Sequence, residues 1–376
     1  MGMCFIIGFA LFFLLSEISQ LGLCGGCIES EKRALLKFKA SFHDDPHNRL
    51  SSWNPKTNCC QWHGIACHNI TGHVLKLDLS FFSLEAIRVD PSLLDLKHLI
   101  YLDLSQNNFN AISIPILFGS MERLSYLSIS ESNFKGMIPA NLGGNLTNLQ
   151  FLDLSWNHLH TNDMSWVSNL QSLQYLNLSD VYLGEAHNLF QVLHMLPSLL
   201  QLQLEGCGLG NLFAPFPSIN STYNARVQVL SLAGNEIDGQ IFNAFQNWTS
   251  LEFLDLYSNN FSSMPLWFGE FKNLIFIDLS WNALCGPIPA VLRNMTSLEY
   301  LDLSSNNFSL IPSLLGELKR LRYLDISKNR IIATAMDISV SQILKNKCHL
   351  KIFYFDTSNL QGEAFGDFDF SGCIKY

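Results

Sequence analysis

The amino-acid sequence predicts an α/β solenoid, in which successive turns of the chain stack one short parallel strand beside the next. The first observation is a phrase of the form L-x-x-L-x-L-x-x-N-x-L, which occurs in twelve copies that begin 23 to 29 residues apart. The second is the alternation within L-x-L, which is the period of a strand with one buried face. These phrases predict about twelve coils around one apolar core, with first positions at Val74, Leu99, Leu124, Leu149, Leu173, Leu199, Val227, Leu251, Leu274, Leu298, Leu321 and Leu350.

Residues 1–26 are typical of a secretory signal peptide. The apolar block at residues 1–15 is short for a membrane span, and small residues follow at positions 22–26. We expect cleavage near Cys24 or Gly26. An uncleaved anchor is the alternative, because no Lys or Arg precedes the apolar block. No later segment has the length and hydrophobicity of a membrane span. The mature chain is therefore expected to be secreted.

Residues 27–73 are predicted to form an N-terminal cap domain. The segment SEKRALLKFKASF indicates a helix, because Leu35, Phe38 and Phe42 fall on one helical face. Ser30 is the expected N-cap, with Glu31 in the first turn. Such a domain covers the apolar edge of the first coil, which a stack of coils would otherwise expose to water.

Residues 74–376 carry the repeats, and the ninth position of each phrase is predicted to form an inward-facing polar column. An Asn amide there satisfies backbone groups where the strand ends. Ser replaces the amide in part and Cys only weakly, whereas Phe and Val do not, so their coils are expected to be locally irregular. Asn occurs at Asn107, Asn157, Asn235, Asn259, Asn282, Asn306 and Asn329, and the exceptions are Phe82, Ser132, Val181, Cys207 and Ser358.

This phrase identifies the chain as a leucine-rich-repeat protein. Several copies continue with a G-x-I-P stretch or a remnant of it: GMIP at residues 136–139, GPIP at 286–289 and SLIP at 309–312. These stretches resemble the plant-type subclass of the repeat, which implies a second short strand in each such coil. Pro is tolerated there because an edge position does not have to donate a ladder hydrogen bond.

The segment LSSWNPKTNCCQWHGIACHNITGHVLKLDLS, with its CC-x-W-x-G-x-x-C core and GHV, resembles the N-terminal cap of plant leucine-rich-repeat proteins. That resemblance implies a disulfide between Cys27 and Cys59 and a second one between Cys60 and Cys67.

Residues 163–209 resemble one particular class of plant leucine-rich-repeat proteins. They are similar to a W-[LV]-S-x-L-x-S-L…LPSL-x-x-L-x-L-x-x-C-x-L passage of plant receptor-like proteins, in the class related to the ethylene-inducing-xylanase receptors. Members of this family continue into further repeats, a C-terminal cap, a membrane helix and a short cytoplasmic tail. We therefore interpret residues 74–376 as repeats truncated without a C-terminal cap, and the chain as the N-terminal part of such an ectodomain.

Composition and motifs argue against several other function classes. The 376 residues are 48% hydrophobic and 15% charged, with a net charge of −9 and no cluster of Lys and Arg for nucleic acid. The sequence contains no nucleotide loop, H-E-x-x-H, G-x-S-x-G or kinase signature. His63, His68 and His73 surround Cys67, but the cysteines there fit disulfides better than zinc. We expect no enzyme, no cofactor and no metal site.

The predicted concave face of the sheet is the candidate ligand-binding surface. Aromatic residues at the third position and Asp at the fifth position recur along it, and structural roles are favoured for both columns. The Asp column is expected on a solvated face. More informative are residues that break the repeat pattern, because a specific partner would contact those: Trp156, Gln201, Gln203, Glu205, Tyr257 and Trp281.

The remaining cysteines and the sequons complete the predicted sites. Cys207 is expected to be a buried thiol, since three coils separate it from Cys285. Cys348 and Cys373 are one coil apart and are expected to pair. Eight N-x-S/T sequons favour several glycans: Asn69, Asn145, Asn177, Asn220, Asn247, Asn260, Asn294 and Asn307.

The sequence is therefore interpreted as an extracellular recognition module for a protein, peptide or glycan ligand. By resemblance it acts in plant defence or development at the cell surface, in the plasma membrane in full-length relatives, and signals through a partner receptor-like kinase. One alternative is a secreted cell-wall protein resembling polygalacturonase inhibitors, which a C-terminal cysteine cap would distinguish. Another is a non-functional fragment of a receptor gene.

Overall fold

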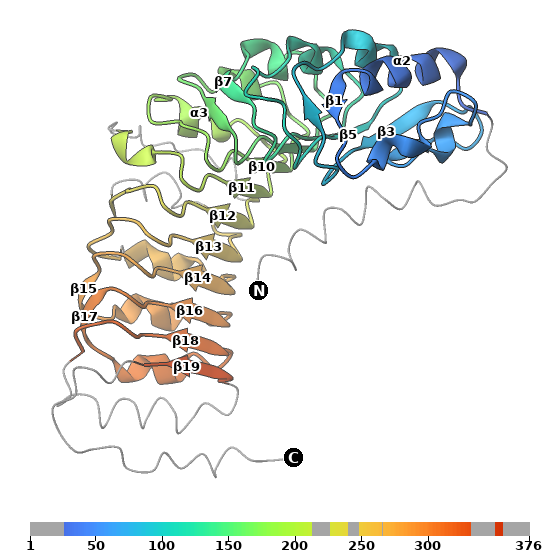
Figure 1. The fold of residues 1–376 in the computed structure, drawn as a ribbon. Coiled ribbons are helices and arrows are strands. Elements are labelled where there is room, and N and C mark those ends of the chain that lie inside the picture. The colour runs from blue at the N-terminus through green and yellow to red at the C-terminus, as the bar shows by residue number, and fades with distance from the viewer. Residues whose placement is uncertain (1–25, 213–225, 240–247, 265, 332–349, 356–376) are drawn as a thin grey trace, which may run out of the picture. The chain divides into compact units, whose positions relative to one another are not determined.

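The structure is a computed structural model that describes residues 26–212, 226–239, 248–264, 266–331 and 350–355. The chain divides into two compact units, Met1–Leu159 and His160–Tyr376, which are described separately (Figure 1). Residues 1–25 of the predicted signal peptide lie outside the described part. Among the described residues, every helix is too short or too polar to cross a lipid bilayer.

The first unit contains the N-terminal helix α2 (Glu29–Lys39) and five strands of a largely parallel sheet. One strand of residues 27–73 pairs antiparallel with the first repeat strand, and the repeat strands then follow one another in parallel and in register. Each contributes a fully buried leucine, and these leucines make the core of this unit. In spatial order the strands are β2 (Ile65–Cys67), β3 (Val74–Asp78), β5 (Tyr101–Asp103), β6 (Tyr126–Ser128) and β8 (Phe151–Asp153).

The second unit contains eight parallel strands in chain order, and its registers are continuous. The predicted α/β leucine-rich-repeat solenoid is thus confirmed, with one three-residue strand for each described coil of this unit. The strands are β10 (Tyr175–Asn177), β11 (Gln201–Gln203), β12 (Val229–Ser231), β13 (Phe253–Asp255), β14 (Phe276–Asp278), β16 (Tyr300–Asp302), β18 (Tyr323–Asp325) and β19 (Ile352–Tyr354).

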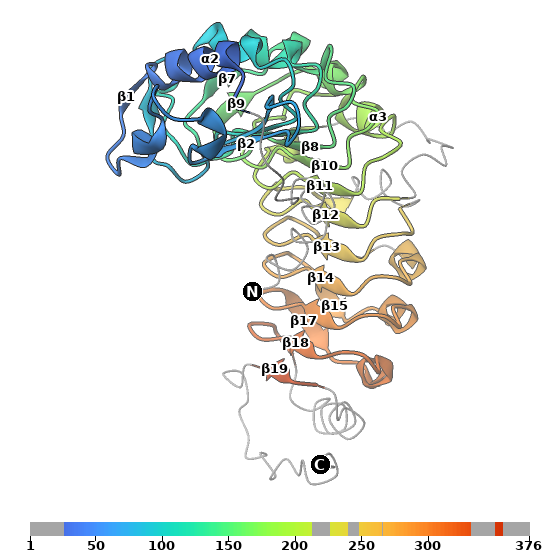
Figure 2. The same ribbon diagram turned by 90° about the vertical axis from the view of Figure 1, so that its right-hand side faces the viewer.

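Short helices lie on the side of each unit away from the main sheet (Figures 1 and 2). Most are single 3-10 turns, which suit the few residues left between a strand and the next coil. They are α3 (Leu189–Leu193) and the 3-10 helices Pro91–Asp95, Ile116–Ser120, Ala140–Gly143, Ser165–Val167, Leu209–Asn211, Leu266–Glu270, Ala290–Asn294 and Ser313–Glu317. Two further 3-10 helices, Arg49–Ser52 and Cys59–Gln61, belong to the N-terminal cap.

The second short strands predicted from the I-P stretches are present. GMIP and its neighbours form β7 (Lys135–Met137), which pairs with β9 (His158–His160). GPIP begins within β15 (Cys285–Pro287), which pairs in parallel with β17 (Asn307–Leu310). A further pair, β1 (Phe42–Asp44) and β4 (Glu85–Ala86), joins the cap segment to the first coil in antiparallel fashion.

The polar column at the ninth position connects neighbouring coils. Asn157 is 2% exposed, and its Oδ1 accepts from the amides of Ser132 and Phe134 in the preceding coil. Its Nδ2 donates to the carbonyls of Ile129, Leu154 and Ser155. One side chain therefore satisfies five backbone groups of two coils.

The substitutes in this column behave largely as predicted. The Ser132 hydroxyl donates to the Leu104 carbonyl at 2.7 Å, and the Cys207 thiol approaches the Leu178 carbonyl at 3.1 Å. For Phe82 and Val181 the predicted irregularity does not reach the strands, because β3 and β10 pair with the next strand without a register shift. Ser358 lies outside the described residues.

Two details of the predicted cap helix are wrong. Ser30 lies inside α2, whose N-cap is Ile28 without a side-chain hydrogen bond. Phe42 leaves the helix for β1 and packs edge-on against Phe38, with ring centroids 5.0 Å apart. The apolar face is otherwise as expected, since Leu35 and Phe38 are fully buried.

We predict that Asn157→Ala lowers the free energy of unfolding by about 3 kcal/mol, because it leaves several buried backbone groups without partners. Urea denaturation followed by circular dichroism measures this change. Asn148→Ala is the matched control, since Asn148 is exposed and donates one bond, to the Glu122 carbonyl. An equally small effect of both substitutions would contradict the role given to the column.

Candidate functional site

The aromatic residues at the third position of each phrase stack into ladders along the sheet. In the first unit the rings of Tyr101, Tyr126 and Phe151 follow one another at 4.0 and 4.2 Å and are at most 8% exposed. In the second unit Phe253, Phe276, Tyr300 and Tyr323 stack at 4.1, 4.2 and 4.1 Å. Because each ring covers the next, these columns have the structural role that the sequence predicts.

The Asp column at the fifth position is buried more deeply than expected. Asp103 and Asp302 are 5% and 7% exposed, so the expectation of a solvated face is wrong for both. Asp302 Oδ1 accepts from the Ser304 amide at 2.9 Å, and the same arrangement recurs at Asp278 and Asp325. These bonds fix the turn that follows each strand, since a carboxylate two residues before an amide closes such a turn.

Burial sets the protonation behaviour of this column. Desolvation raises the pKa of Asp255 and of Asp302 to about 6, and the hydrogen bonds from the following residues oppose that rise. Glu205 also has a raised pKa, because it is partly desolvated. In Asp302 the neighbouring carboxylates of Asp278 and Asp325 raise the pKa further.

The eighth position of the phrase adopts a left-handed backbone in every coil where the structure describes it. The φ angle there lies between 49° and 65°, and Gly, Ser, Asp, Glu, Gln or Lys fills most copies. Trp156 and Trp281 occupy this position at φ 54°, with the residues 48% and 55% exposed. Phe81 is a third aromatic there and is 64% exposed. Bulky residues are rare in this conformation, so they are not explained by folding.

The tryptophans therefore lie in the turn directly after a strand, beside the sheet rather than within it. The ammonium of Lys328 lies over the Trp281 ring, 5.5 Å from the ring centroid.

Tyr257 is 41% exposed at the seventh position, where most coils carry Ser, and its amide donates to Asp255. Gln201 and Gln203 lie half-buried in β11, and Glu205 follows that strand. Of the six predicted binding residues, all but Trp156 lie in the second unit.

Both cap disulfides that the resemblance implies are present in the structure. Cys27 bonds to Cys59, and Cys60 bonds to Cys67. Cys207 is a buried thiol, and burial raises its pKa far above the ordinary value. Cys285 is exposed and free of a disulfide among the described residues. The expected Cys348–Cys373 pair lies outside them.

The sequons differ in their accessibility. The side chain of Asn177 is buried in β10, at the fifth position of its phrase, where its Oδ1 accepts from the Ser179 amide. This burial argues against a glycan at Asn177 in the folded chain. Asn69 is half-buried, whereas Asn145, Asn260, Asn294 and Asn307 are exposed; Asn220 and Asn247 lie outside the described residues.

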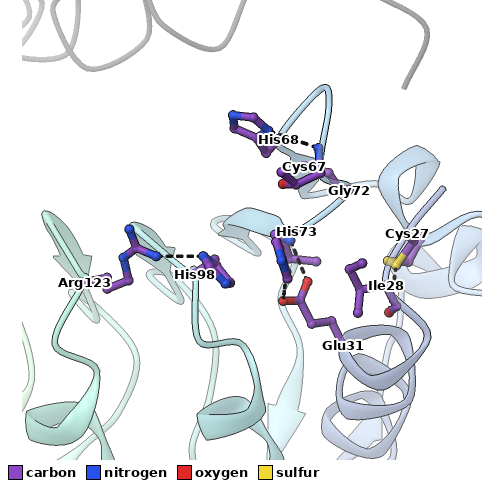
Figure 3. Close-up of polar contacts among 12 residues, drawn as sticks. Cys27, Ile28, Glu31, Cys67, His68, Gly72, His73, His98 and Arg123 are labelled. Atoms are coloured by element: carbon purple, nitrogen blue, oxygen red, sulfur yellow. Dashed lines mark hydrogen bonds and ion pairs between the residues drawn. A yellow bond between two sulfur atoms is a disulfide. The ribbon is translucent and has the colours of Figure 1, made fainter. Parts of the chain in front are cut away.

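A polar cluster at the N-terminal cap was missed by sequence reasoning. Glu31 of α2 is 3% exposed, and its carboxylate accepts from His73 Nδ1 at 2.8 Å and from the Val74 amide at 2.7 Å (Figure 3). The His73 ring stacks on His98 at 3.8 Å, and His98 Nδ1 lies 2.7 Å from Arg123. The sequence signal was slight: a basic or imidazole residue stands directly before the first three phrases.

Comparisons with known proteins agree with this architecture. Residues 28–68 match the leucine rich repeat N-terminal domain family, and leucine rich repeat families match residues 98–121, 148–170, 226–248, 250–271 and 289–331. Receptor-like protein EIX1 of Solanum lycopersicum is 36% identical over 296 residues, which are 73% of this chain and 28% of that protein. Receptor-like protein EIX2 of the same organism is 43% identical over 82 residues, 19% of this chain and 8% of that protein. This chain thus spans about a quarter of EIX1.

Solved structures with the same fold include receptor kinase ectodomains of Arabidopsis. The HAESA ectodomain with an N-terminally extended IDA peptide hormone has a TM-score of 0.66 and 31% identity, over 80% of this chain and 49% of that one. HAESA with IDA and the co-receptor SERK1 has a TM-score of 0.66 and 26% identity, over 87% of this chain and 58% of that one.

We predict that Asp302→Asn stabilises the protein at pH 7.5 by roughly 1 kcal/mol, after allowance for solvent screening. A raised pKa means that folding becomes less favourable as the pH rises from 3.8 through about 6, and the amide removes that loss. Asn is tolerated at this position, as Asn177 shows. Urea denaturation from pH 4 to pH 8 should show an advantage that disappears at the acid end. An advantage independent of pH would contradict the assigned cause.

We predict that Asn145, Asn260, Asn294 and Asn307 carry glycans and that Asn177 does not, because only an exposed amide can hold a glycan in the folded chain. Site-resolved mass spectrometry on protein secreted from plant cells, with enzymatic deglycosylation in ¹⁸O water, measures occupancy at each Asn. Full occupancy of Asn177 would show that its strand is placed wrongly.

Proposed function

Because the chain belongs to the plant leucine-rich-repeat receptor-like proteins, we propose that it is an extracellular ligand-recognition region that binds a protein or peptide. The EIX1 likeness, the N-terminal repeat domain and the shared fold of HAESA support this proposal. In this view the chain carries out no reaction, and it acts at the cell surface after passage through the secretory pathway.

The observation that carries the proposal is the placement of Trp156 and Trp281. Each occupies a left-handed backbone position that favours small or polar residues, and about half of each residue remains exposed. Neither property helps the protein to fold, because strain costs stability and an exposed indole gains little burial. Large aromatic side chains are, however, the residues that contribute most to protein interfaces. Binding is therefore the best account of both positions.

The ligand class follows from the surroundings of Trp281. Tyr257 lies one coil before it, and three coils before it the half-buried Gln201 and Gln203 of β11, with Glu205 directly after that strand, provide hydrogen-bonding groups in the same unit. Exposed aromatics and amide and carboxylate groups along one sheet suit an extended polypeptide, which offers apolar side chains and backbone donors together. HAESA, a structural relative, has been solved with a peptide hormone and the co-receptor SERK1. We propose a receptor-like kinase as the signalling partner of this chain too.

We predict that Trp281→Ala weakens binding of a ligand that contacts the second unit about tenfold or more, in the range of an interface hot spot, without loss of folding. Trp156→Ala should have the same effect on a ligand that contacts the first unit. The ligand is sought by displaying secreted plant proteins and peptides on yeast and selecting with the glycosylated chain. Affinity of each selected ligand is then measured by biolayer interferometry, and folding by circular dichroism.

Gln106→Ala and Ser305→Ala are the matched controls, because they change the same left-handed position in other coils. They should alter affinity less than twofold. If every selected ligand binds all four variants equally well, the tryptophans are not part of the interface and the proposal loses its main support.

A further inference from the structure

The N-terminal cap is joined to the first three coils by one continuous chain of polar contacts. Glu31 supplies the cap end, and its two oxygens hold the ring of His73 and the first amide of β3. His73, His98 and Arg123 each stand directly before a phrase, so they form a row from coil to coil (Figure 3). After the Glu31–His73 hydrogen bond, the stacked rings of His73 and His98 continue the row, and the hydrogen bond from Arg123 to His98 completes it.

The hydrogen bond from Arg123 requires His98 to be neutral for this row of polar contacts to form. A guanidinium can only donate, so the Nδ1 atom of His98 has to be the acceptor, and His98 is neutral in this arrangement. A proton added at Nδ1 would face a permanent positive charge at 2.7 Å and remove the acceptor. The geometry is therefore compatible with one charge state of His98 only.

We propose that the row Glu31–His73–His98–Arg123 is an acid-sensitive latch, which holds the cap on the first coils at neutral pH and loosens when His98 takes up a proton. This proposal is independent of the proposed ligand recognition. The row lies entirely within the first unit, so its opening can be followed there separately from the titration of Asp255 and Asp302 in the second unit.

The groups that face His98 act mostly in the same direction. Desolvation is the largest influence on its pKa, followed by His73 and Arg123, and all three lower the pKa from 6.5. Glu31 opposes them, and His68 adds a small lowering effect. A histidine whose pKa is lowered by folding stabilises the fold fully above pH 6.5. That stabilisation is lost as the pH falls below 6.5 toward the lowered pKa.

Exposed Arg123 can swing away from a charged His98, but His73 has less freedom. Its ring is held against His98 by stacking and against the buried carboxylate by a hydrogen bond. Strain from His98 protonation therefore passes to the Glu31 contacts, including the bond from the Val74 amide. The Val74 amide is thus a local reporter of latch opening.

Hydrogen exchange at the Val74 amide tests the latch directly. The glycosylated chain is compared at pH 7.5 and pH 5.5 by mass spectrometry with electron-transfer fragmentation, after correction for intrinsic exchange rates. The opening equilibrium constant should rise at the lower pH, by at most about tenfold, which is the limit for one site with an ordinary pKa of 6.5. Overall thermal stability is unsuitable, because the raised pKa values of Asp255 and Asp302 stabilise the fold on acidification.

Three variants distinguish the latch from general acid sensitivity. His98→Gln keeps an acceptor for Arg123 but does not titrate, so the pH dependence at Val74 should disappear. Arg123→Gln should reduce it. Arg320→Gln, an exposed residue directly before the eleventh phrase, should leave it unchanged. Protection at Val74 that is independent of pH in the wild type, or a pH dependence that survives His98→Gln, would overturn the proposal.

Discussion

The constraint on which the structure depends is that no coil can bury its own apolar face. Each coil contributes a three-residue strand and a few leucines, which is far too little for a core, so it is stable only against a neighbour. The polar groups at the end of each strand face the same problem, because they become buried as soon as the next coil is added. The Asn column solves it with one amide that binds two coils at once, as Asn157 shows.

This constraint also separates structural from functional residues on the sheet. Residues that repeat in register can cover one another, which is why the tyrosine and phenylalanine ladders are stacked and why Asp302 is nearly buried. A residue that breaks the pattern is not covered by a matching side chain in the neighbouring coils. Trp281 remains half exposed for this reason and is free to contact a partner. Residues that break the repeat pattern are therefore the best candidates for ligand contacts.

Much of the fold could be predicted from the sequence, because its interactions are local or recur at a fixed spacing. The coils, the second strands at GMIP and GPIP, and the polar role of Ser132 follow from single phrases. What could not be predicted depends on contacts across coils. The N-cap at Ile28 rather than Ser30, and the burial of Asn177 within a sequon, depend on the packed position of the residue rather than on its motif. The role of Glu31 could not be predicted because its partner His73 lies 42 residues later in the chain.

In the proposed function, exposed pattern-breaking residues beside the sheet bind a polypeptide ligand. Differential hydrogen exchange of the second unit, with and without a ligand obtained by display, tests it most directly. We expect added protection in the turns after β13 and β14, which contain Tyr257 and Trp281, and in β11. Protection confined to the short helices on the opposite side, such as Ala290–Asn294, would contradict it.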